Sequence, residues 1–284
     1  MTNVKCNLCG AVNNVADEVC TVCGAELQSQ SHYHGSEDQN AFRQSLKIIP
    51  PFDGAGDVIG PTFGLFFRNL WPITKIVFVI VAPFEVFKTL SLRNIEADPQ
   101  LVVGITALQL LCNALIVPAL FYSLVQVMET GIAPSVNEAY RWGLSKIPKL
   151  SLSAVLSWIL IMLGTLLCII PGIILGLAFH VVYPVAVFEQ RSAVDVLKRS
   201  YELTEGRRWN IFLAGIVIAI VVGLGSLPAQ AAVAALAINR VDSVPLLIAA
   251  AIYTDILAEV STIFSLVVYL GILRTLGGRR SILE

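Results

Sequence analysis

Six long apolar segments are the feature that most limits what this chain can fold into. They cover residues 72–92, 101–127, 150–169, 172–189, 209–227 and about 250–273. A helix needs about 20 predominantly apolar residues to cross the hydrocarbon core of a bilayer. Only 14% of the residues are charged and the mean hydropathy is +0.76, whereas soluble domains carry roughly 25% charged residues. We therefore predict an all-α integral membrane protein with six transmembrane helices in the lipid bilayer.

The Lys and Arg residues predict the orientation of these helices. If the chain crosses the membrane at each segment, all but three of its 19 Lys and Arg residues lie on the side of the termini, the exceptions being Lys88, Arg93 and Arg240. Cytoplasmic loops carry such an excess of Lys and Arg. The first sixty residues contain no apolar run of the kind found in signal peptides. We therefore expect a plasma-membrane protein with both termini in the cytoplasm.

A pair of C-x-x-C motifs stands at the N-terminus, in the stretch CNLCGAVNNVADEVCTVCG. Cys6, Cys9, Cys20 and Cys23 offer four thiolates from two tight turns, which suits tetrahedral zinc. About twenty residues cannot bury a sufficient core, so the metal would supply the folding free energy. The alternative of two disulfides requires an oxidising compartment, which the predicted orientation argues against. We predict a zinc ribbon over residues 1–27, with Zn²⁺ as cofactor.

This motif resembles the short zinc-ribbon family of bacteria and archaea. The matching positions are Cys6, Cys9, Gly10, Asn13, Cys20, Cys23, Gly24 and Leu27. The module has one Lys, no aromatic residue and three acidic residues, whereas single-stranded nucleic acids are bound by basic and aromatic groups. We therefore expect that the zinc ribbon binds no nucleic acid and has a structural or protein-contact role. Residues 28–58 are polar and rich in Gly and Pro, which predicts a flexible linker before a membrane domain at 59–284.

Three short segments share a pattern and suggest an internal repeat. They are TFGLFFR from Thr62, SVNEAYR from Ser135 and SAVDVLK from Ser192. Each starts with a hydroxyl residue suited to a helix N-cap and continues with apolar residues on one helical face. We predict three amphipathic elbow helices in the membrane interface, each before a hairpin of two spans, with Arg68, Arg141, Lys198 and Arg199 near anionic headgroups. Because the spacing between the copies differs, chance similarity is the alternative.

Residues 171–212 carry a second resemblance. The stretch PGIILGLAFHVVYPVAVFEQRSAVDVLKRSYELTEGRRWNIF is similar to the membrane domain attached to bacterial glycerophosphoryl diester phosphodiesterases and to its stand-alone relatives. The matching positions are Pro171, Gly172, Pro184, Glu189, Leu197, Arg199, Ser200, Leu203, Gly206 and Trp209. The resemblance implies a membrane fold but no hydrolase activity, because the catalytic barrel of those enzymes would need a further domain. We also predict a tight hairpin at Pro171–Gly172 between the third and fourth spans.

Ionisable residues within the apolar segments are the remaining candidates for function. Asp255 and Glu259 lie one turn apart in the last segment, and His180 lies in the fourth. Asp255 and Glu259 suggest a proton- or cation-coupled path, and with His180 they suggest the polar cavity of a transporter. In the alternative interpretation the acids lie at the outer interface and His180 is a packing residue. Glu85 and Lys88 are expected to pair or to extend toward the interface.

No motif of a soluble enzyme is found, neither a phosphate-binding glycine loop nor a nucleophile or metalloprotease motif. We therefore expect a non-enzymatic membrane scaffold or regulatory protein whose zinc ribbon contacts a cytosolic protein. The alternative function is transport of a small solute, an ion or a lipid through the acidic residues.

Overall fold

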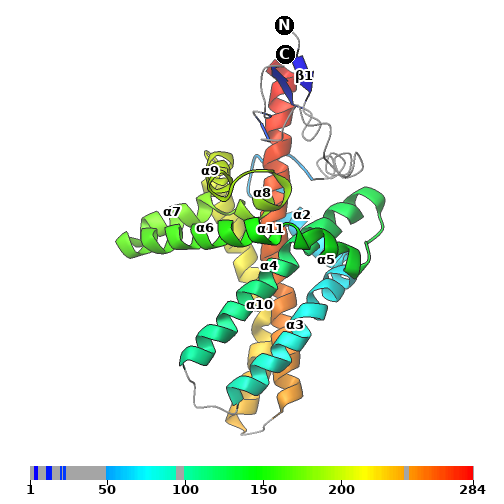
Figure 1. The fold of residues 1–284 in the computed structure, drawn as a ribbon, viewed down its shortest axis with the longest axis vertical. Coiled ribbons are helices and arrows are strands. Elements are labelled where there is room, and N and C mark those ends of the chain that lie inside the picture. The colour runs from blue at the N-terminus through cyan, green and yellow to red at the C-terminus, as the bar shows by residue number, and fades with distance from the viewer. Residues whose placement is uncertain are drawn as a thin grey trace.

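The computed structural model describes residues 3–5, 11–14, 20, 22–23, 49–93, 99–239 and 243–283. Within these residues the chain forms two short strands followed by helices (Figure 1). The elements are β1 (Asn3–Lys5), β2 (Val12–Asn14), α2 (Gly56–Arg68), α3 (Leu70–Arg93), α4 (Pro99–Thr130), α5 (Val136–Leu144), α6 (Ile147–Leu167), α7 (Ile169–Ala178), α8 (Val182–Phe188), α9 (Ala193–Thr204), α10 (Arg208–Ile238) and α11 (Val244–Leu283).

The helices confirm the prediction of a multi-span, all-α membrane domain. Six helical stretches are long and apolar enough to cross a membrane: Leu70–Ser91, Pro99–Thr130, Ile147–Leu167, Ile169–Phe188, Arg208–Leu236 and Val244–Leu276. Their bounds lie within a few residues of most of the predicted segments. The fifth stretch ends at Leu236, nine residues later than predicted, and the sixth begins earlier, at Val244 instead of about residue 250.

The last helix, α11, is the centre of the molecule. In its most apolar window 72% of the residues are buried, compared with 17% for α6 and for α10. It packs against α2, α3, α4, α8, α9 and α10, and Figure 1 shows it running through the full length of the bundle. Because lipid does not drive apolar helices together as water does, this contact depends on close packing and on polar contacts.

The segment before α2 is packed onto α11. The backbone N–H of Phe52 donates to the Gly271 carbonyl at 3.2 Å and to Oγ1 of Thr275 at 2.9 Å. A Cβ at Gly271 would lie 3.1 Å from that of Phe52, so glycine permits this approach. Ile49 and Phe52 are each 1% exposed. The packed domain thus begins before the predicted boundary at residue 59, while 28–48 of the predicted linker lie outside the described residues.

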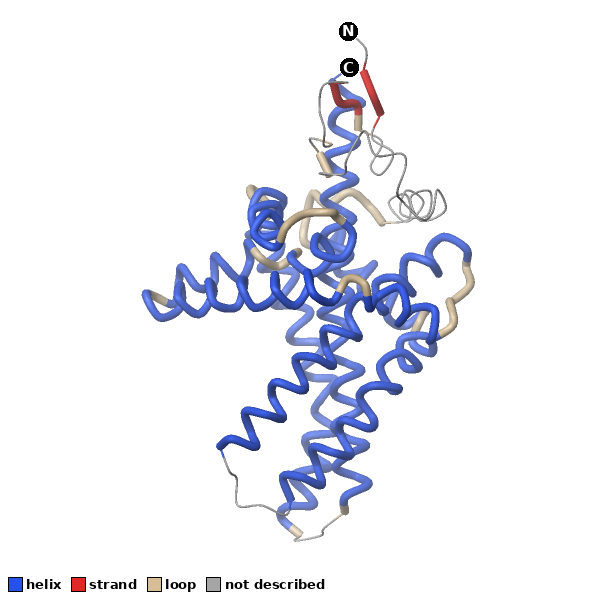
Figure 2. Tube along the Cα trace, in the orientation of Figure 1, coloured by secondary structure: helices blue, strands red, loops and turns tan. Residues whose placement is uncertain are grey.

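Helices α6 and α7 form an arm that crosses the direction of α3, α10 and α11 (Figures 1 and 2). The turn between these helices was predicted at Pro171–Gly172, and this position is wrong. The chain reverses at Cys168, which has extended backbone angles, and Pro171 and Gly172 lie in the first turns of α7. A Cβ at Gly172 would lie 2.9 Å from Cα of Thr165 on α6. Glycine is therefore used here for close helix packing.

The fourth apolar stretch, Ile169–Phe188, is a broken helix. It consists of α7 and α8, with a turn at residues 179–181. The carbonyl of Ala178 at the break accepts hydrogen bonds from Oγ of Ser200 at 2.8 Å and from Oγ1 of Thr204 at 3.2 Å. Both hydroxyls come from α9, so that helix provides the hydrogen bonds that the interrupted helix lacks.

Two of the three predicted elbow helices begin as expected. Ser135 caps α5 and Ser192 caps α9, each hydroxyl accepting a hydrogen bond from the backbone N–H three residues later at 3.3 Å. The first copy differs, because Thr62 lies inside α2, which begins at Gly56. Its hydroxyl donates to the carbonyl of Val58 at 2.6 Å and is buried. The predicted N-cap at Thr62 is therefore wrong. Only the second and third copies of the repeated pattern begin a helix.

Candidate functional sites

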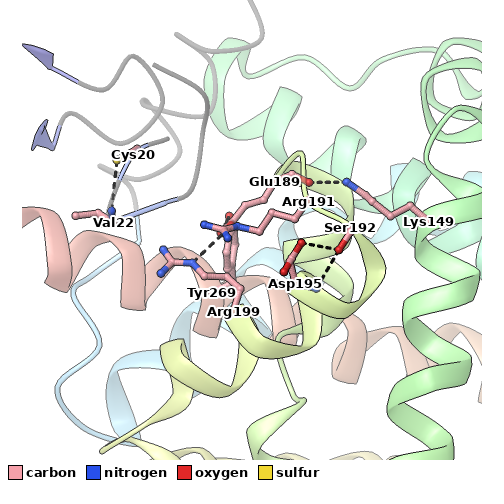
Figure 3. A network of polar contacts seen from close by, with 9 residues as sticks. All are labelled: Cys20, Val22, Lys149, Glu189, Arg191, Ser192, Asp195, Arg199 and Tyr269. Carbon is pink, nitrogen blue, oxygen red and sulfur yellow. Dashed lines mark hydrogen bonds and ion pairs between the residues drawn. The ribbon is translucent and has the colours of Figure 1, made fainter. Parts of the chain in front are cut away.

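A buried carboxylate, Glu189, joins four helices at the end of the bundle that carries β1 and the end of α11. Its Oε2 accepts a hydrogen bond from Nε of Arg191 at 2.9 Å and lies 3.5 Å from Nε of Arg199. Its Oε1 accepts from the hydroxyl of Tyr269 at 3.1 Å, and its carbonyl accepts from Nζ of Lys149 at 2.5 Å. Figure 3 shows these side chains converging from α6, α9, α11 and the segment after α8.

The electrostatics of this network follow from burial. The side chain of Glu189 has no exposed surface, and that of Arg199 is 8% exposed. Burial raises the pKa of the Glu189 carboxyl, and the positive charges of Arg199 and then Arg191 oppose that rise. A buried ion pair of this kind contributes little net stability, but removing one partner leaves the other charge uncompensated.

The second C-x-x-C motif lies next to this network. Cys20 and Cys23 are 1% and 0% exposed and belong to the same buried cluster as Val22 and Tyr269. Cys23 is close enough to the Tyr269 hydroxyl for an electrostatic interaction. The backbone N–H of Val22 donates to Sγ of Cys20 at 3.4 Å (Figure 3). The cysteine motif is therefore packed on the bundle.

A second polar site lies within the spans, where α3 packs against α11. Glu85 on α3 has no exposed side-chain surface and accepts an ion-paired hydrogen bond from Lys88 through Oε1. Across the helix contact, the carboxyl of Asp255 is in hydrogen-bonding contact with that of Glu85. One turn further along α11, Glu259 is 9% exposed and hydrogen-bonds with Thr262. Two carboxyl groups and one ammonium group thus meet inside the apolar part of the bundle, and a third carboxyl group lies one turn away along α11.

This site extends toward α4 and α5. The hydroxyl of Tyr140 on α5 donates to the carbonyl of Ile76 at 2.6 Å. Burial raises the pKa of this hydroxyl, and the nearby Glu259 and Cys112 raise it further. Tyr140 therefore stays neutral and hydrogen-bonded, and it supplies no positive charge to offset the carboxylates.

The predicted site residues fall into separate places. Asp255 and Glu259 lie together, about three and four turns inside α11, whereas His180 lies at the break between α7 and α8 and packs against Phe264 with ring centroids 4.6 Å apart. The structure thus does not bring His180 into the acidic site. Arg68, Arg141 and Lys198 are exposed, but Arg199 is buried against Glu189 instead of facing headgroups. Cys6 and Cys9 lie outside the described residues.

Sequence reasoning missed the role of Glu189 and the contact of Glu85 with Asp255. The signal for Glu189 was an acid at the end of an apolar segment, with Arg191 and Arg199 two and ten residues later. No signal in the sequence pairs residue 85 with residue 255, because the contact depends on how α3 packs on α11. Comparison with models of known protein families, with curated proteins and with solved structures finds no match.

Proposed function

We propose that this chain is a non-enzymatic membrane scaffold or regulatory protein whose N-terminal cysteine module binds zinc and contacts a cytosolic protein. The observation that carries the proposal is the packing of Cys20, Val22 and Cys23 on the end of the bundle. A module docked there is in contact with Tyr269, and through Tyr269 with Glu189 and Arg199. A partner or metal at the module would therefore act on the ends of α8, α9 and α11.

The described part of the module fits a zinc knuckle. The strands β1 and β2 pair antiparallel, with Val4 opposite Asn13, and the segment that joins them contains Cys6 and Cys9. The amide contact to Sγ of Cys20 is the kind that stabilises a thiolate at a tight turn. Cys6, Cys9, Cys20 and Cys23 would hold the ion, which would supply the folding free energy of the module. These features also support the resemblance to the short zinc-ribbon family.

The distribution of charge supports a cytoplasmic location of both termini. Figure 1 shows β1 and the C-terminal part of α11 at the same end of the molecule. The helices and connecting segments toward that side carry Arg68, Lys75, Arg141, Lys146, Lys149, Arg191, Lys198, Arg207, Arg208 and Arg274. We propose that this end faces the cytoplasm of a plasma membrane, where thiolates stay reduced and available to zinc. The resemblance to the phosphodiesterase membrane domain remains a proposal about the fold.

Zinc content and partner contact together test this function. The variant with Cys20→Ser and Cys23→Ser should insert into the membrane like the unaltered chain but lose its bound zinc, measured by elemental analysis of the purified protein. Crosslinks from residues 1–27 to cytosolic proteins in cells should be lost in parallel. Cys168→Ser, a change at an exposed thiol in the α6–α7 turn, is the matched control. Identical zinc content or identical crosslinks in the double variant would contradict the proposal.

A second candidate function, transport of a small solute, an ion or a lipid, is favoured by one observation. Asp255 and Glu259 lie inside α11 next to Glu85, and not at its end as a purely interfacial role requires. Reconstituted protein with Asp255→Asn and Glu259→Gln should then lose a flux that the unaltered protein supports. An unchanged flux or lipid distribution would remove this candidate.

A further inference from the structure

The carboxyl groups between α3 and α11 carry more negative charge than their surroundings can balance. Lys88 is the one cation in contact with Glu85 and Asp255 among the described residues, and it is paired with Glu85. If Glu85, Asp255 and Glu259 were all ionised, two negative charges would remain uncompensated. Uncompensated charges are costly inside a bilayer and are found there with a counter-ion or a function.

The contact between Glu85 and Asp255 specifies how part of this charge is removed. An ionised carboxylate only accepts hydrogen bonds, whereas a protonated one carries one O–H donor. A hydrogen bond between two carboxyl groups therefore requires a proton on one of them. Paired carboxyl groups in enzymes share one proton for the same reason, since two like charges at contact distance repel.

Two buried oxygen atoms show that the site is not complete without a further donor. Among the described residues, Oε2 of Glu85 and Oε2 of Glu259 are buried and receive no hydrogen bond while the neighbouring carboxyl groups are ionised. Both side chains are more than nine-tenths buried, and Glu85 faces Asp255 across the helix contact. Buried polar atoms almost always have a partner, and leaving one unpaired destabilises the fold.

The remaining neighbours do not supply this donor. The hydroxyl of Tyr140 donates to the carbonyl of Ile76, and Thr262 hydrogen-bonds with Glu259. The thiol of Cys112 on α4 lies near Tyr140, and an S–H group is only a weak donor. Among the residues that the structure describes, no group of three acidic, His or Cys side chains is arranged to hold a metal ion. The geometry therefore favours a proton over a coordinated metal.

We propose that Glu85 and Asp255 form a proton-binding site inside the membrane, in which the two carboxyl groups share one proton and Glu259 is the next acceptor along α11. Lys88 holds the other oxygen of Glu85 and so fixes the direction in which the shared proton points. The site goes beyond both proposed functions, because it needs neither zinc nor transport. It assigns a chemical role to Glu85, which neither the apolar pattern nor the charge distribution had indicated.

Infrared spectroscopy of the full-length protein in lipid nanodiscs tests the proposal directly. A protonated carboxylic acid has a C=O stretching band that an ionised carboxylate lacks. The unaltered protein should show this band at neutral pH, and the band should shift when water is replaced by D₂O. Glu85→Gln and Asp255→Asn should each remove the band of the pair, while Glu202→Gln, at an exposed acid on α9, should leave it unchanged.

Three results would overturn the proposal. One is the absence of the band in the unaltered protein at neutral pH, a measurement that does not depend on whether the variants fold. Another is a band that persists in both single variants. The third is loss of the band when sodium chloride replaces choline chloride, because the cation held by the pair would then be sodium and not a proton.

Discussion

The contact with Glu189 explains why Arg199, a cation expected at the membrane surface, lies in the core. Arg199 follows Lys198 in the sequence, and the helical repeat places the two about 100° apart around α9. Lys198 is exposed, whereas Arg199 points at Glu189. The hydrogen bond from Tyr269 and the ion pair from Arg191 complete the surroundings of that carboxylate.

Replacing Arg199 by Ala should cost about 3 kcal/mol of unfolding free energy at neutral pH, since Glu189 keeps a buried charge with less compensation. The pKa of Glu189 lies above its ordinary value of 4.5. A raised carboxyl pKa gives stability that is complete below the ordinary value and is lost as the pH rises through the folded-state value. Loss of Arg199 raises that pKa further, so the cost of the substitution should shrink in acid.

The measurement is reversible unfolding in mixed detergent micelles between pH 4.5 and neutral pH. Lys198→Ala is the control, because its side chain is exposed, and we expect a change of about 0.5 kcal/mol or less. A cost for Arg199→Ala that is the same at every pH would show that the loss is one of packing and not of charge.

The hydroxyl residues that begin the three repeated segments have different roles in their helices. Ser135→Ala and Ser192→Ala should each cost about 1 kcal/mol, because each removes the acceptor for an N–H in the first turn of a helix. Thr62→Val should cost less unfolding free energy than either serine substitution. Its hydroxyl donates to the carbonyl of Val58, which as a residue inside a helix already has a backbone partner. Unfolding free energies of the three variants check this, and an equal loss at all three positions would restore the repeat.

The glycines of α7 make a further prediction. Gly172→Ala should destabilise the α6–α7 arm by about 1–3 kcal/mol, because its Cβ would overlap the backbone of Thr165. Gly176→Ala on the same helix has nothing within 4 Å of its Cβ, and the higher helix propensity of alanine should leave stability unchanged or slightly increased. Hydrogen exchange of α6 and α7 measures the difference. Equal protection in both variants would contradict the close packing at Gly172.

For the whole molecule, the apolar pattern predicted most of the fold and only part of the candidate sites. Length and hydropathy predict spans such as Leu70–Ser91 because a bilayer imposes both requirements on each helix separately. The N-caps at Ser135 and Ser192 were predictable because each involves residues only three apart in the sequence. The contact of Glu85 with Asp255 and the burial of Arg199 were not, because each depends on the packing of helices distant in sequence. The same holds for the position of the arm.

The α6–α7 arm gives the last prediction, which concerns how the molecule lies in the bilayer. Helix α6 is 21 residues long, or about 30 Å, enough to cross a bilayer if it stood upright. Its direction nevertheless crosses that of α3, α10 and α11 (Figure 1). Leu166 and Leu167 at the tip are 85% and 84% exposed, and residues 164–176 contain no charge. The residues that separate α3 from α4 and α10 from α11 include Glu96, Asp98, Arg240 and Asp242, whose charges favour water. We therefore expect the uncharged tip of the arm to lie within the hydrocarbon and not at an aqueous surface.

A nitroxide on a non-canonical residue at position 167 measures this depth without touching the native cysteines. In liposomes its relaxation should respond to oxygen, which concentrates in the hydrocarbon, and hardly to a water-soluble nickel complex. The same label at Ser243, between α10 and α11, should show the opposite preference, because an α10–α11 hairpin that crosses the bilayer ends at the water. If the label at 167 were as accessible to nickel as the label at 243, the arm would reach the aqueous surface and cross the membrane. The exposed apolar side chains of α6 would then contact lipid along an upright helix, and the bundle would have to tilt to permit it.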